Sequence, residues 1–113
     1  KSYLNVKSFD VNHGKIVAKG YLINKTAYIS DCNGIPNKSM FFLQKLDCLI
    51  LDCFRYKKHV THFSFNDAIE TINLLKPKRA ILTNLHNDLD YKILKQKLPS
   101  WIEPAFDGMK INI

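Results

Sequence analysis

The sequence predicts an α/β fold with α+β layering, and two observations lead to this prediction. Up to residue 31, the chain is rich in β-branched and aromatic residues bounded by turn-forming residues, which is typical of consecutive strands. After residue 47, short apolar runs alternate with helical stripes of apolar residues, which is typical of βα units. A chain of 113 residues can bury one core, so we expect residues 1–113 to form a single domain.

Three strands are expected first, over residues 3–11, 15–23 and 26–31. Asn, His, Gly and Lys residues between these ranges provide the turns. After a Gly-Pro loop, Asn37 is expected to cap a short helix, whose apolar residues are Met40, Phe41, Leu43 and Leu46.

Two buried strands with a helix between them are expected next. Residues 48–51 form a continuous apolar run that ends at Asp52, which is typical of a strand with both faces buried. Ser64, with an acidic residue three positions later, predicts a capping box, and the helix that begins there ends before Pro77. Residues 80–82 form the second buried strand.

The remaining sequence predicts one more helix and a hairpin. Asp88 or Asp90 is expected to begin the helix, and Pro99 to end it. Strands over residues 102–106 and 109–113 are expected on either side of an Asp-Gly hairpin turn.

Composition excludes several classes of protein. Hydrophobic residues make up 46% and charged residues 24%, which is ordinary for a globular domain. No apolar run reaches the length of about 18 residues that a membrane span needs, and no signal peptide follows Lys1. The three cysteines have no CxxC spacing and are expected to be small core residues in a reducing, cytoplasmic setting.

The net charge of +7 leaves two interpretations open. The basic residues are spread over the chain, so they can be a solvated surface or can attract phosphate-bearing small molecules. A basic nucleic-acid-binding module is a further alternative, which we disfavour because no aromatic–basic recognition motif is visible.

Polar residues at the ends of apolar runs are the candidate site: His13, Asp31, His62 and the pair Asn84/His86. Strand ends hold the backbone rigidly and leave side chains open to solvent. Imidazole binds Zn, Fe, Ni or Mn, and a carboxylate can bridge two cations. Each residue taken alone is also compatible with a turn, a cap or an exposed loop position.

His62 precedes the capping box, and a histidine near a helix N-terminus suits general acid chemistry. Asn84 and His86 are two residues apart, so their side chains point to the same side if the strand continues through them.

The order of these segments resembles the C-terminal half of a metallo-β-lactamase-fold hydrolase, and the phosphoribosyl cyclic phosphodiesterase branch in particular. The similar stretches are VNHG (11–14), AYISDCNGIP (27–36), LILDCFR (49–55), THFS (61–64), LTNLHNDLDY (82–91) and PAFDGM (104–109).

The resemblance implies half of an αββα sandwich, with a mixed sheet and helices on one face. It implies that His13 binds one metal of a dinuclear Zn or Mn site and that Asp31 bridges both metals. It also implies that His62 lies near the substrate phosphate and acts as an acid or stabilises charge there. The last ligand of the family is a histidine directly after Leu-Thr, where this chain has Asn84. We therefore expect His86 to be that ligand, with Asn84 orienting it or coordinating weakly.

The family's HxHxDH segment has no counterpart in residues 1–113. The resemblance therefore implies hydrolysis of a cyclic phosphodiester by a metal-bound hydroxide only when an N-terminal half chain or a homodimer completes the site. The isolated chain is expected to bind metal weakly or not at all, and a degenerate, non-catalytic remnant is the alternative. Arg55 is a candidate for binding the substrate phosphate, and His59 is expected to be exposed.

Overall fold

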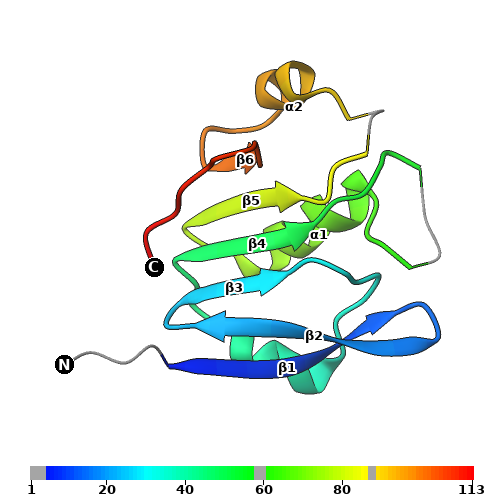
Figure 1. Ribbon diagram of the computed structural model, residues 1–113, viewed down its shortest axis with the longest axis vertical. Coiled ribbons are helices and arrows are strands. Elements are labelled where there is room, and N and C mark those ends of the chain that lie inside the picture. Colours follow the sequence, from blue (N-terminus) through cyan, green and yellow to red (C-terminus); the bar gives the residue numbers. More distant parts are fainter. Residues whose placement is uncertain (1–4, 58–60, 87–88) are drawn as a thin grey trace.

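The computed structural model describes residues 5–57, 61–86 and 89–113. Its centre is a single six-stranded sheet, with helices packed on it as the sequence predicts (Figure 1). In spatial order, which is also chain order, the strands are β1 (Val6–His13), β2 (Ile16–Ile23), β3 (Thr26–Ile29), β4 (Cys48–Asp52), β5 (Arg79–Thr83) and β6 (Ile102–Pro104).

The sheet is mixed. Strand β2 pairs antiparallel with both of its neighbours, β1 and β3. The pairs β3–β4, β4–β5 and β5–β6 are parallel. Every strand except β2 therefore runs in the same direction, and five carboxyl ends meet at one edge of the sheet (Figure 1). This edge collects the polar residues that follow the strands.

The described residues also form three short helices: η1 (Asn37–Leu43), α1 (Phe65–Leu75) and α2 (Tyr91–Lys97). Helix α1 lies behind the parallel strands, and α2 packs beside β6 at one end of the sheet (Figure 1). The core between α1 and the sheet is fully buried and includes Leu49, Leu51, Ile72 and Leu82. Its lack of polar side chains explains why residues 48–51 and 80–82 read as continuous apolar runs.

The capping box is confirmed. The Ser64 hydroxyl accepts from the Asp67 backbone N–H, and the Asp67 carboxylate accepts from the Ser64 N–H. Both bonds fix the loop that leads into α1, and His62 lies two residues before it.

The face of β1–β3 that points away from the buried core carries exposed apolar side chains. Tyr21 and Tyr28 are cross-strand partners and are 43% and 42% exposed, and Val17 on the same face of β2 is 62% exposed. Alternation along β2 puts Val17 and Tyr21 on one side of the sheet. Lys19 lies between Val17 and Tyr21 on the same side and forms an ion pair with Asp10, so the exposed apolar side chains of this face are interrupted by charge.

Several local predictions are wrong. The first helix forms as a 3₁₀ helix, but Pro36, not Asn37, occupies its N-cap. His13 is the last residue of β1 instead of a turn residue. No strand forms over residues 109–113, because the chain leaves the sheet after β6, and α2 packs against that edge strand (Figure 1). His59 and Asp88 lie outside the described residues.

None of the helices in the described ranges is long and apolar enough to cross a membrane.

Candidate metal centre

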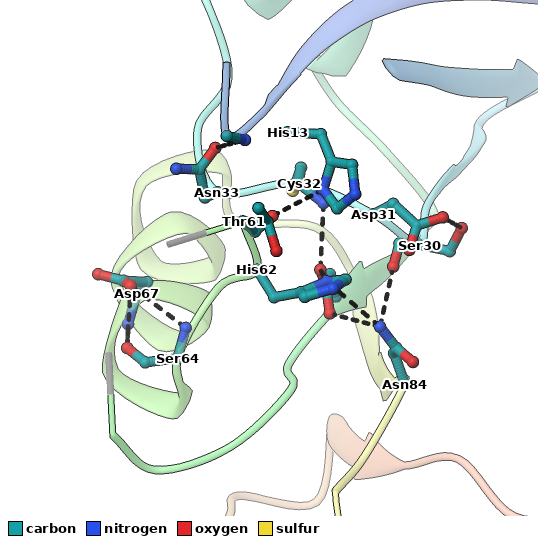
Figure 2. A network of polar contacts seen from close by, with 12 residues as sticks. His13, Ser30, Asp31, Cys32, Asn33, Thr61, His62, Ser64, Asp67 and Asn84 are labelled. Atoms are coloured by element: carbon teal, nitrogen blue, oxygen red, sulfur yellow. Dashed lines mark hydrogen bonds and ion pairs between the residues drawn. The ribbon is translucent and has the colours of Figure 1, made fainter. Parts of the chain in front are cut away.

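His13 is held by a backbone contact at the end of β1. Its Nδ1 lies 2.8 Å from the carbonyl oxygen of Thr61 (Figure 2). Because a carbonyl can only accept, Nδ1 carries the proton and donates. A neutral imidazole in this tautomer presents Nε2 as its basic nitrogen, which is the arrangement usual for a metal-binding histidine.

Asp31 follows β3 and is exposed at the same edge of the sheet. The Ser30 hydroxyl donates to its Oδ2 at 3.3 Å. The next residue, Cys32, is buried and points its backbone N–H at the Asp52 carboxylate, at 3.1 Å. This anchor fixes the direction in which the chain leaves β3.

Asp52, the last residue of β4, is fully buried. Its Oδ2 accepts from His62 Nδ1 at 2.7 Å, and its Oδ1 accepts from Asn84 Nδ2 at 3.3 Å. Burial raises the pKa of the Asp52 carboxyl, and hydrogen bonds from Cys32, His62 and Asn84 oppose that rise. A buried carboxylate with three donors is held in one orientation, and it holds His62 in turn.

Sequence reasoning missed Asp52 and treated it only as the end of a strand. One signal could have revealed it. A carboxylate that directly continues a run of residues buried on both faces is itself expected to be buried, and a buried carboxylate needs donors. His62, ten residues downstream, is such a donor.

His62 receives contacts on several sides. The Phe54 ring stacks on it with centroids 4.8 Å apart, and the His13 ring meets it edge-on at 5.0 Å. Its side chain is 15% exposed. The Asp52 contact uses Nδ1, so Nε2 is the nitrogen that can react at the surface.

Asn84 does not lie on a continuing strand. Strand β5 ends at Thr83, and Asn84 has a left-handed backbone conformation with φ of 62°. The premise that placed Asn84 and His86 on the same side is therefore wrong. The Asn84 amide nitrogen instead faces Asp52, the Ser30 carbonyl at 3.5 Å and His62 Nδ1 at 3.4 Å (Figure 2).

His86 lies beyond this network. Its ring meets Phe54 edge-on at 5.3 Å, and its backbone N–H donates to the Phe54 carbonyl at 2.7 Å. Arg55 also lies on this side: its guanidinium is 6.0 Å from the Phe54 ring centroid. Phe54 is thus the shared neighbour of His62, His86 and Arg55.

Three candidate residues converge at the sheet edge. Ligand atoms of His13, Asp31 and His62 all lie within 4.8 Å of one another (Figure 2). Two imidazoles and a carboxylate are a donor set suited to a divalent transition metal, and the two Nδ1 contacts supply the outer hydrogen bonds such ligands usually have. The residues present therefore fit a metal ion. His86 is outside this group.

Comparison with known proteins agrees with this fold. Residues 2–84 match the family described as the beta-lactamase superfamily domain. This is most of the chain, which therefore belongs to that superfamily and has the fold of a metallo-β-lactamase-type hydrolase.

A crystal structure described as a new diphosphatase from the PhnP family is 33% identical and superposes with a TM-score of 0.94, over 97% of this chain and 44% of that one. Human tRNase Z, short form, shares the fold at 21% identity and a TM-score of 0.76, over all of this chain and 43% of its own. An octanoyltransferase from Porphyromonas gingivalis is 28% identical over 97% of this chain. The chain spans only 23% of that protein and less than half of each solved structure.

Proposed function

We propose that this chain supplies one side of a metal-dependent phosphodiesterase centre. The observation that carries the proposal is the convergence of His13, Asp31 and His62 at one sheet edge, with both imidazoles oriented by Nδ1 contacts. The net charge of +7 supports a phosphate-bearing substrate, since it raises the local concentration of anions.

In this proposal His13 and Asp31 would hold a divalent metal ion such as Zn or Mn. Divalent metal ions, when bound, lower the pKa of water and neutralise charge on a phosphoryl group. His62 donates a proton from Nε2 to the phosphoryl or leaving oxygen. Asp52 keeps the other ring proton on Nδ1 and stabilises the charged ring.

The remaining ligands come from outside residues 1–113. A catalytic zinc ion has three protein ligands, and His13 and Asp31 provide two when His62 serves as the acid. We propose that an HxHxDH-bearing half, in the same protein, a partner chain or a second copy, packs on the exposed face of β1–β3. The exposed Val17, Tyr21 and Tyr28 support this. The burial of all three cysteines and their lack of CxxC spacing support a cytoplasmic setting.

The test combines this chain with the part of the similar diphosphatase that it does not cover, in the presence of Zn or Mn. Hydrolysis of bis(p-nitrophenyl) phosphate well above that of either piece alone is expected, and the His13→Ala variant should abolish it. His86→Ala is the matched control and should keep the activity. No rate above the separate pieces would contradict the proposal and favour a non-catalytic remnant.

A further inference from the structure

A cavity of about 460 Å³ lies beside the candidate metal centre, between the end of β5 and the segment after β6. Residues 83–85 line one side, and residues 105–109 line the other. Asn84 connects the cavity with the candidate metal centre. It lines the cavity, and its amide nitrogen is 3.4 Å from His62 Nδ1. A group bound in the cavity would therefore lie next to Asn84, which contacts the His62 ring at Nδ1.

The wall formed by residues 105–109 is fixed by backbone contacts. The Ala105 N–H donates to the Leu82 carbonyl at 2.8 Å, which ties the segment to β5. The Met109 N–H donates to the Phe106 carbonyl at 3.0 Å and closes a turn. Gly108, at the third position of this turn, has a φ of 83°, as a type II turn requires. The cavity is thus largely formed before a ligand arrives.

The lining side chains define what can bind. Phe106 is 51% exposed, and its ring rests edge-on against Tyr91 at 6.1 Å, so it offers a supported aromatic surface for a flat ring. Asp107 is the one charged residue among the described residues that line the cavity. Its carboxylate accepts hydrogen bonds from hydroxyl groups and repels a phosphate.

We propose that this cavity binds the part of the substrate beyond the reacting phosphate. It selects an uncharged, hydroxyl-bearing group with a flat ring, and it disfavours a group that carries a second phosphate. The role of the cavity in binding the leaving group rests on the proposed function. Its preference for an uncharged group over a phosphate-bearing one can be measured without metal.

The experiment follows amide resonances of the full 113-residue chain by NMR while adenosine, and separately adenosine 5′-monophosphate, is added. Adenosine provides the ring and hydroxyl groups without charge. Adenosine should shift the amides of residues 105–109 at millimolar concentration, and the monophosphate should require at least threefold more. Because the whole chain is basic, non-specific attraction alone predicts the reverse order.

Two variants separate the roles of the cavity residues. Phe106→Ala should weaken adenosine binding about tenfold, as expected for a lost stacking surface. Phe41→Ala is the matched control, because Phe41 is an 81% exposed phenylalanine on η1, and it should leave binding unchanged. Asp107→Asn should bring the monophosphate to the affinity of adenosine. Equal losses in both phenylalanine variants, or a monophosphate that binds more tightly to the unaltered chain, would overturn the proposal.

The hydrolysis assay with the complementary half distinguishes the two proposals. A chain that binds adenosine at residues 105–109 but gives no hydrolysis with that half keeps the binding preference and loses the proposed function. A chain that supports hydrolysis but binds no adenosine loses only this inference.

Discussion

The Nδ1 of His62 lies 2.7 Å from the Oδ2 of Asp52, and the carboxylate is fully buried at the carboxyl end of β4. Two segments that are separate in the sequence meet in this contact, namely a buried strand and the loop that leads into α1. The Cys32 N–H and the Asn84 amide complete the surroundings of the same carboxylate. The orientation of the candidate proton donor therefore depends on β3, β4 and β5 together.

Replacement of Asp52 by Ala should lower the free energy of unfolding by about 3 kcal/mol, because one buried and two partly buried donors lose their acceptor. Urea unfolding measures the change. Asp47→Ala is the control: Asp47 is 54% exposed in its ion pair with Lys78, and its loss should cost less than about 1 kcal/mol. Equal losses of stability in the two variants would show that the hydrogen bonds to Asp52 stabilise the fold no more than an exposed ion pair does.

Two variants at Asn84 separate its backbone from its side chain. Asn84→Ala should be less stable than Asn84→Gly by about 1 kcal/mol, because alanine is strained in the left-handed region. Both should be less stable than the unaltered chain, since the bond to Asp52 is lost. Asn24, with a φ of 54° in the turn between β2 and β3, is the matched position. If Asn84→Gly cost no more than Asn24→Gly, the amide would not stabilise the network.

Replacement of Ser64 by Ala should cost about 1 kcal/mol of stability, because the N-terminus of α1 loses its capping acceptor. Thermal and urea unfolding both measure it. The exposed Ser100→Ala variant should be nearly neutral. A neutral Ser64→Ala variant would contradict the role assigned to the capping box.

The three thiols should be nearly unreactive in the folded chain. Cys32 and Cys53 are fully buried and Cys48 is 4% exposed. Burial raises the pKa of the Cys32 thiol, and the charge of Asp52 raises it further. Few thiolates therefore form at about pH 8. Ellman's reagent should label all three cysteines in denaturant and less than one in native buffer, whereas rapid native labelling of Cys32 would contradict this burial.

The sequence predicts the framework well where one physical signal dominates. Residues 48–51 and 80–82 are apolar throughout and all buried except the half-buried Ile50, and Ser64 with Asp67 forms the predicted capping box. The Asp-Gly turn at 107–108 also forms, but it does not make a hairpin. A turn signal is local, whereas pairing depends on which sheet edge is open, and β6 pairs in parallel with β5 instead.

The candidate site is only partly predictable for a similar reason. His13, Asp31 and His62 were identified because strand ends are visible in the sequence as boundaries of apolar runs. The assignment of His86 depended on β5 continuing beyond Thr83, and the left-handed conformation of Asn84 ends that strand. The role of Asp52 depends on a contact with His62, ten residues away, which no local pattern specifies.

The central claim is that His13 and Asp31 bind a divalent metal beside His62. The most direct measurement is paramagnetic broadening of the NMR resonances of the chain by substoichiometric Mn²⁺, which detects even weak binding. If His13 and Asp31 bind the ion, resonances around residues 13, 31 and 62 should broaden selectively. This broadening should be abolished in His13→Ala and retained in His86→Ala. Broadening centred on other acidic residues, or unchanged broadening in His13→Ala, would contradict metal binding by His13 and Asp31.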